Sequence, residues 1–405
     1  MKKQYIILLF LLTMSLALII QLMESPVMSG GEQISLSKAE YYQMAETQQR
    51  FQKLLDLEHE IHQKYYLDTG EIDFDTALYR GLFGALDKYS SYFTPEEYED
   101  YTAGLSGEIV GIGTTIEAYD DVVRVVQPIA DGPAERAGIL AEDIIWKVDQ
   151  TELAGLTLDE SVDLMRGEAG TAVTIFVRRG SEDLEFRLIR ARITTSSVNW
   201  EVRDGQIGYI RISHFEQPTA NQFRQAMRQL EQEDIRGLVI DLRSNPGGYL
   251  HSVVEVAQQI LDKTTIVTEV SRDGREKVYA SQSGNKLEIP YVVLVNRSSA
   301  SASEIMAGAI QDTESAKIIG ETTTGKGVVQ TSYRLADGSG FRVTTARYLT
   351  PAGRDIHGVG IEPDITIEAI EQAGYPLPES LRLGAEDDAV LNYAVDFLKA
   401  LVAMQ

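Results

Sequence analysis

Residues Ser298–Gln330 read SSASASEIMAGAIQDTESAKIIGETTTGKGVVQ, and the rest of the expected fold is organised around them. Their middle part predicts a helix that opens just after Ser301, because Glu304–Ile310 contains no helix breaker except Gly308. A helix start leaves backbone N–H groups unpaired and carries partial positive charge. A hydroxyl at Ser301 would therefore lie beside donors suited to an oxyanion. Lys326 follows twenty-five residues later between two glycines, and we interpret the pair as nucleophile and base.

The segments around this stretch alternate between strand and helix. Apolar runs predict strands at Ile207–Ile212, Leu238–Leu242, Tyr291–Val295 and Lys317–Ile319, and the intervening patterns predict helices at Thr219–Glu233, Tyr249–Leu261 and Ser303–Ile310. This rhythm is typical of an α/β fold with a parallel or mixed sheet and crossover helices. Arg243–Gly248 and Asn296–Ser301 each follow the carboxyl end of a strand, so we expect both loops on one rim of the sheet.

A smaller module is predicted between Glu108 and Ile193. It contains a glycine-rich turn at Gly111–Ile116, several short alternating strands, and a Thr157/Glu160 capping box that opens a helix ending near Met165. This order resembles a PDZ domain, which captures an extended C-terminal peptide by adding it to a sheet as a strand. Taken alone, the glycines would predict only a tight turn.

The amino-terminal residues predict a membrane or export segment. Residues 5–23 are nearly all apolar, span about one bilayer as a helix, and follow Lys2 and Lys3. No Ala-x-Ala cleavage site follows them, so an uncleaved anchor is the favoured interpretation, with a cleaved signal or a buried core helix as alternatives. In the first two cases the body of the protein is extracytoplasmic.

Composition excludes several classes of partner and site. The net charge of −24, from 37 basic and 61 acidic residues, argues against nucleic acid or an anionic membrane surface as the main partner. The chain has no cysteine, which excludes disulfides and thiolate metal sites. No metal motif such as HExxH appears, and no cofactor is expected.

Three motifs carry a family resemblance: SASASEI at Ser299–Ile305, GKGVVQ at Gly325–Gln330 and DLRSNPGG at Asp241–Gly248. Together they resemble the active-site segments of the carboxy-terminal processing (tail-specific) proteases, a family of PDZ-containing serine endopeptidases. The resemblance implies a crotonase-like mixed sheet with an inserted PDZ domain. It divides the chain into an anchor or signal segment (1–24), a linker (25–37), a helical N-terminal region (38–104), a PDZ domain (105–193), a protease core (194–372) and a C-terminal helical region (373–405).

The resemblance also assigns roles to individual residues. Gln330 would orient Lys326, and the oxyanion hole would use the N–H groups of Gly247 and Ala302. Gly111, Ile112 and Gly113 would form the loop that holds a peptide carboxylate, and Arg166 would couple peptide capture to catalysis. The family further implies protein C-terminal tails as substrates, a homodimer and a regulatory protein partner.

The proposed dyad sets a condition on Lys326. Its amine must be neutral to act as a base, whereas a free lysine titrates near 10.4. The negative charge of the chain would stabilise the ammonium form, so we expect local burial, which can lower a lysine pKa by about 3–5 units, to dominate.

The predicted geometry of Gln330 depends on the local backbone. If the segment from Lys326 to Gln330 is extended, their Cα atoms lie about 13 Å apart, whereas one helical turn brings their Cβ atoms within about 5–6 Å. A direct hydrogen bond requires the turn, but the two intervening valines favour a strand. Asp312 would lie about 16 Å from Ser301 along a continuous helix, so we expect a structural role for it.

Other mechanisms and functions stay open at this level. A histidine triad is the rival mechanism, and His251, just after the glycine loop, is the histidine nearest to the motifs. The alternative functions are a PDZ scaffold that binds tails without cleaving them and a ligand-binding protein on the same crotonase-like core.

Overall fold

The computed structural model describes residues 37–119, 122–129, 131–194, 196–282, 284, 286–377 and 382–404. The chain divides into two compact units, Met1–Asp75 and Thr76–Gln405. The predicted anchor at residues 5–23 lies outside the described residues. Within the described ranges, none of the helices combines the length and apolar character needed to cross a membrane.

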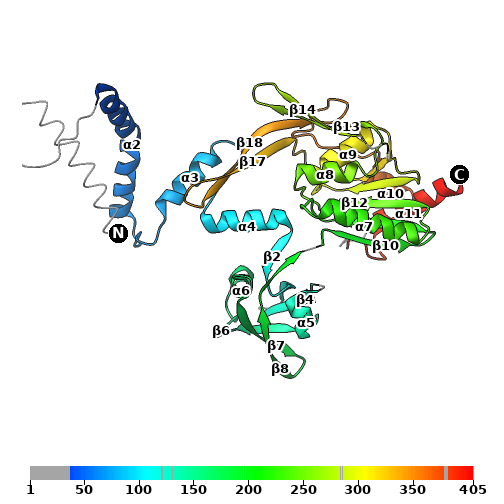
Figure 1. Ribbon diagram of the computed structural model, residues 1–405, viewed down its shortest axis with the longest axis horizontal. Helices are drawn as coiled ribbons and strands as arrows, with labels where there is room; N and C mark the ends of the chain where they lie inside the picture. The colour runs from blue at the N-terminus through cyan, green and yellow to red at the C-terminus, as the bar shows by residue number, and fades with distance from the viewer. Residues whose placement is uncertain are drawn as a thin grey trace, which may run out of the picture. The chain divides into compact units, whose positions relative to one another are not determined.

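Six strands form the central sheet of the larger unit (Figure 1). Their order is β10 (Val198–Arg203), β11 (Ile207–Ile212), β12 (Gly237–Asp241), β15 (Tyr291–Val295), β16 (Lys317–Gly320) and β19 (Ile365–Thr366). β10 runs antiparallel to β11, and the other pairs are parallel, which confirms the predicted mixed sheet. Every residue of β12 and β15 is buried, because both faces of the sheet are covered.

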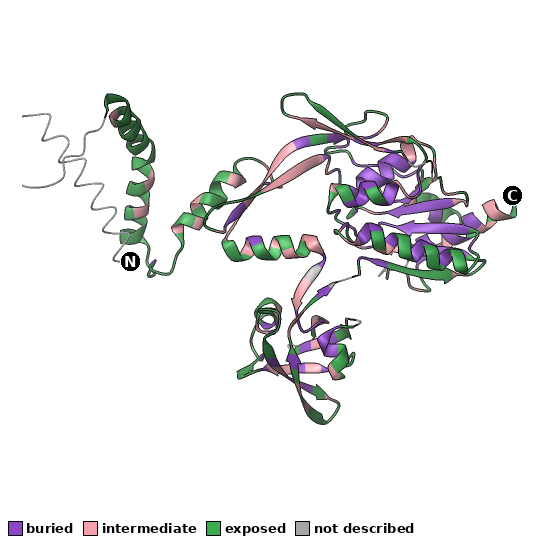
Figure 2. Ribbon diagram, in the orientation of Figure 1, coloured by how far each residue is buried: buried purple, intermediate pink, exposed green. Residues whose placement is uncertain are grey.

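Helices cover both faces of this sheet. α7 (Thr219–Gln232), α8 (Leu250–Ala257) and α9 (Ala302–Asp312) share one hydrophobic core with it, whereas α10 (Ile367–Gln372) and α11 (Ala389–Ala403) share a second core with the opposite face. Figure 2 shows buried residues concentrated in the sheet and in α9. The predicted C-terminal helix therefore packs on the core of its own chain.

A second sheet lies beside the helical layer and was not predicted. It contains β1 (Ser91–Phe93), β18 (Gly340–Leu349), β13 (Thr264–Ser271) and β14 (Glu276–Ser281), with β17 (Val328–Arg334) also paired to β18. β1 follows α3 (Phe74–Gly84) and precedes α4 (Pro95–Ser106), which opens with a Thr94/Glu97 capping box. β1 and β18 pair although about 250 residues separate them, so this sheet ties the start of the larger unit to its core.

The PDZ module has its own sheet and core. The strands follow the order β3 (Thr114–Tyr119), β4 (Val122–Pro128), β5 (Ile144–Val148), β7 (Ala172–Arg179) and β8 (Glu182–Ile189), with β6 (Thr151–Glu152) paired to β5. Two helices accompany them, α5 (Pro133–Ala137) and α6 (Leu158–Met165), and the Thr157/Glu160 capping box is confirmed. β2 (Glu108–Gly111) pairs with β9 (Ala191–Thr194), which brings the two ends of the module together.

The smaller unit contains the helix α2 (Lys38–Lys64). It begins with a Ser37/Glu40 capping box, at the start of the predicted helical region 38–104. α2 has no buried residue, and its apolar side chains Phe51, Leu55 and Ile61 are exposed.

Candidate active site

Ser301 sits where the chain turns from β15 into α9. It is the N-cap of the helix, with φ of 54° and ψ of −112°, a conformation that non-glycine residues rarely adopt. The loop that carries it, Asn296–Ser301 (the serine loop), is fixed to the neighbouring loop Arg243–Gly248 (the glycine loop). The Ser299 hydroxyl donates to Leu242 O at 2.8 Å, and Ala300 N donates to Asn245 O at 3.0 Å. The two loops predicted to share a rim therefore interlock, and they hold the serine in a strained turn.

Gly247 lies directly against the serine loop. A Cβ atom at this position would come within 2.8 Å of both Ala300 O and Ser301 Cβ, so only glycine fits. The N–H group of Gly247 donates to Asn245 Oδ1 at 2.8 Å, so this predicted oxyanion donor is engaged inside its own loop. Ala302 supplies the first N–H group of α9, which a helix leaves without an intrahelical acceptor.

Glu304 connects the serine loop to the loop that carries Lys326 (Gly325–Gly327, the lysine loop), a role that the sequence did not predict. Its fully buried carboxylate accepts from Ser301 N and Lys326 N through Oε2, both at 2.8 Å. Oε1 accepts from the Thr323 hydroxyl and from Gly325 N, both at 2.6 Å. The Ser-x-x-Glu spacing of a capping box was the available signal for this residue.

Lys326 is half-buried beside this carboxylate. Burial lowers the pKa of Lys326 and Arg342 adds to the shift, whereas Glu304 and Asp87 oppose it. The Lys326 amine also lies 5.1 Å from the ring centroid of Tyr89. The direction of the pKa shift is the one that a neutral lysine base requires.

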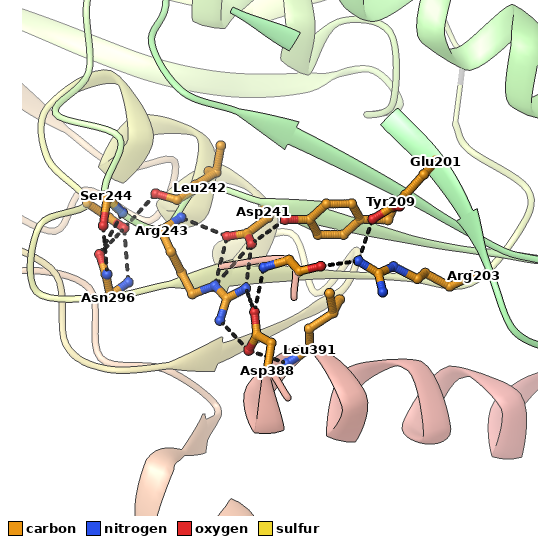
Figure 3. Close-up of polar contacts among 12 residues, drawn as sticks. Glu201, Arg203, Tyr209, Asp241, Leu242, Arg243, Ser244, Asn296, Asp388 and Leu391 are labelled. Carbon is orange, nitrogen blue, oxygen red and sulfur yellow. Dashed lines mark hydrogen bonds and ion pairs between the residues drawn. The ribbon is translucent and has the colours of Figure 1, made fainter. Parts of the chain in front are cut away.

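A buried ionic network anchors the glycine loop at its first residue (Figure 3). Arg243 donates to Asp241 Oδ1 through Nε at 2.9 Å, and its Nη1 and Nη2 donate to Asp388 at 2.9 and 2.6 Å. The hydroxyl of Tyr209 completes the network with a bond of 2.9 Å to Asp241. Asp388 also caps α11 by accepting from Leu391 N at 3.1 Å. The C-terminal helix is thereby joined directly to the loop that carries Gly247.

Charge balance in this network depends on the arginine. Burial works against ionisation of Asp388, but hydrogen bonding and attraction to Arg243 outweigh it and lower the pKa of Asp388. The amino end of α11 adds partial positive charge beside the same carboxylate.

Gln330 lies in the strand β17, which begins at Val328. Its amide donates to Val328 O at 3.3 Å and to the Thr344 hydroxyl at 3.5 Å. The extended backbone does not form the helical turn that a direct bond to Lys326 requires, as the intervening valines had favoured.

The predicted peptide-binding residues line a groove of about 160 Å³ in the PDZ module. Gly111, Ile112 and Gly113 line it together with Val162 and Met165 of α6. Arg166 borders the groove, and its guanidinium pairs with Asp100 of α4 at 3.2 Å.

Two further candidates lie away from these contacts. His251 is exposed in the first turn of α8 and packs its ring edge against Tyr279. Asp312 ends α9, where its carboxylate accepts from Ala352 N at 2.8 Å and pairs with Arg354.

Comparison with known proteins identifies the family. The profile of Peptidase family S41 matches residues 206–367, and a PDZ domain profile matches residues 124–179. A protein of Staphylococcus aureus (strain N315) named "Probable CtpA-like serine protease" is 35% identical over 353 residues, which cover 83% of this chain and 71% of that protein. The chain belongs to the carboxy-terminal processing protease family. These proteases combine a peptidase family S41 domain with a PDZ domain, as the described fold does.

Other family members align over a similar extent. A protein of Staphylococcus haemolyticus (strain JCSC1435) with the same name is 36% identical over 311 residues, 76% of this chain, but the chain spans only 62% of that protein's length. The solved structure of the photosystem II D1 C-terminal processing protease is 32% identical and covers 82% of this chain and 91% of its own, with a TM-score of 0.47.

Proposed function

We propose that this chain is a serine endopeptidase that binds the C-terminal tail of a protein substrate in its PDZ groove and cleaves the substrate with Ser301 and Lys326. The observation that supports it best is the shared carboxylate of Glu304. Because Oε2 accepts from Ser301 N and Lys326 N, both at 2.8 Å, these two nitrogens lie within about 6 Å of each other. The backbones of a serine in a strained turn and of a lysine with a lowered pKa are thus held next to each other.

Acylation follows from this arrangement. The neutral amine of Lys326 accepts the hydroxyl proton of Ser301 while Oγ attacks the carbonyl carbon of the substrate. The Ala302 N–H stabilises the oxyanion, and Gly247 adds a second donor once its bond to Asn245 is shared or released. The lysine then gives its proton to the leaving amine, and an ester of Ser301 remains. Water, deprotonated by the same lysine, hydrolyses that ester and restores the dyad.

The PDZ groove recognises the C-terminal tail of the substrate. An extended tail adds as a strand beside the groove, and the N–H groups around Ile112 hold its terminal carboxylate. The groove is lined largely by apolar side chains, which suits an apolar terminal residue.

Arg166 connects the groove to the core through α4. It pairs with Asp100, and the neighbouring Tyr101 hydroxyl lies 3.0 Å from the Ser332 hydroxyl in β17, the strand that carries Gln330. Occupation of the groove would act along this route on β17, the strand into which Lys326 leads.

We also propose an extracytoplasmic, membrane-anchored location and a homodimer. The support for the anchor is the apolar run at residues 5–23 after two lysines. The support for the dimer is α2, which exposes apolar side chains and buries none. Membrane fractionation and sedimentation of the full chain test these two points.

Digestion of an unfolded protein with an apolar C-terminal tail tests the activity. We expect Ser301→Ala and Lys326→Ala to lower turnover by at least about 1,000-fold. Ser298→Ala, which changes an exposed serine of the same loop, is the matched control and should cleave at the wild-type rate. Full activity of Lys326→Ala would refute the dyad, and a wild type that binds tails without cleaving them would favour the scaffold.

A further inference from the structure

A second residue links the two members of the proposed dyad. Tyr348 lies in β18 and is only 2% exposed, with its ring in the main hydrophobic core. Its hydroxyl donates to Ser301 O at 3.0 Å and also to Lys326 O. The backbone N–H of Tyr348 donates to Gly327 O at 3.1 Å, so its own backbone is tied to the lysine loop.

Tyr348 and Glu304 bind complementary groups of the same two residues. The carboxylate of Glu304 accepts both backbone N–H groups, and the hydroxyl of Tyr348 serves both carbonyl groups. Ser301 comes from the central sheet through β15 and α9, whereas Lys326 leads into β17 of the second sheet. A small shift between the sheets would therefore change the distance between nucleophile and base.

We propose that Tyr348 is a positioning residue of the dyad, and that its shared hydroxyl sets the spacing and orientation of Ser301 relative to Lys326. This inference rests on the proposed function. One hydroxyl proton serves two carbonyl oxygens, so the bond is bifurcated and weakens if either residue moves away. In catalysis a displacement of about 1 Å can cost about 100-fold in rate, which makes such a link consequential.

The chemistry of the site keeps this hydroxyl a donor. Burial raises the pKa of Tyr348 well above its usual value, and the nearby carboxylate of Glu304 adds to the shift. The phenol therefore stays protonated over the whole range in which a protease of this kind would work.

The test compares Tyr348→Phe with Tyr291→Phe. Tyr291 is also a buried core tyrosine, but it begins β15, at the end of the strand opposite to the serine loop. We expect Tyr348→Phe to lower kcat about 10- to 100-fold with KM changed less than about 3-fold, and to slow the reaction of Ser301 with a fluorophosphonate equally. Tyr291→Phe should keep both rates within about 2-fold of wild type, with thermal unfolding measured for both variants.

Each outcome has one meaning. A folded Tyr348→Phe that keeps the wild-type kcat and fluorophosphonate rate overturns the role of Tyr348 and leaves the proposed function intact. A wild type that neither cleaves nor reacts refutes the proposed function, and the positioning role falls with it.

A second measurement is used if Tyr348→Phe does not fold. Tyr348→3-fluorotyrosine retains the hydroxyl, and its ¹⁹F resonance should shift when the fluorophosphonate modifies Ser301, whereas Tyr291→3-fluorotyrosine should show no shift. An unchanged resonance at position 348 on the modified protein overturns the proposal.

Discussion

The rim of the central sheet and the PDZ groove are both bordered by glycine-containing loops, but different forces hold them. At the rim, buried charged side chains hold the loops in place. Glu304 binds both the serine loop and the lysine loop, and Arg243 of the glycine loop pairs with Asp388. In the PDZ module the groove is mainly apolar, and the ion pair at its border, Arg166 with Asp100, is 48% and 60% exposed.

This difference indicates how the two regions behave. A fully satisfied buried network favours one arrangement, because any other leaves a charge unpaired in a medium of low dielectric. An exposed ion pair is screened and contributes little, so it can open or exchange partners at low cost. The rim is accordingly built as a fixed site, and the PDZ module is joined to α4 by a contact that can change.

The largest effect is expected from breaking the buried network. Asp388→Ala leaves Arg243 with one carboxylate partner fewer and removes the cap of α11, so we expect a loss of about 3–5 kcal/mol in the free energy of unfolding. Denaturant unfolding of the full chain measures it.

The adjacent Asp387 is a matched control for this loss. It is 51% exposed and pairs with the exposed Arg382 at 3.4 Å. Asp387→Ala should cost no more than about 0.5 kcal/mol. Equal losses for the two variants would show that the rim is no more rigidly held than the surface.

The central sheet was predictable because its signal is local. Tyr291–Val295 and Ile207–Ile212 are short apolar runs, and their predicted bounds are those of β15 and β11. The second sheet lacks this signal, since β17 and β18 are mostly half-buried and mix polar with apolar residues. Its pairing of Ser91 with Arg342 joins distant parts of the chain, which periodicity does not reveal.

The same distinction between local and long-range signals applies to the residues of the candidate site. Ser301 was predictable from the helix start, and Glu304 was detectable in the same capping motif. Asp388 is 145 residues from its partner Arg243 along the chain, and Tyr348 is 47 residues from Ser301. No local sequence pattern assigns either residue to the site. Long-range contacts of this kind become visible only once the fold is known.

A sharper probe of the fixed rim is the pH dependence of kcat/KM. Because burial lowers the pKa of Lys326 and only the neutral amine accepts a proton, the rate should rise with pH through that lowered pKa. Arg342 lowers the lysine pKa, so Arg342→Gln should move the acid limb to higher pH. Asp87 raises it, so Asp87→Asn should move the limb to lower pH.

The opposite signs make this test specific. A general loosening of the site would shift both profiles in one direction or only reduce the rates. Arg334→Gln, which changes a 62% exposed arginine of β17, is the control and should leave the profile in place. Shifts of equal sign for the two variants would contradict the assignment of Lys326 as the base.

The smallest effect on stability is expected at the exposed contact of the PDZ module. Arg166→Ala should change the free energy of unfolding by less than about 1 kcal/mol, because its partner Asp100 is also exposed. If the contact couples the groove to the core, turnover of a tailed substrate should fall about 5-fold or more while tail affinity changes little.

Asp100→Ala should lower turnover to the same extent as Arg166→Ala, and the double variant should add nothing further. Arg178→Ala, which breaks a similarly exposed pair with Asp183 in the same module, should leave turnover unchanged. Equal losses of affinity and turnover in Arg166→Ala would mean that the groove binds tails without acting on the rim, and the two regions would then be independent parts of one chain.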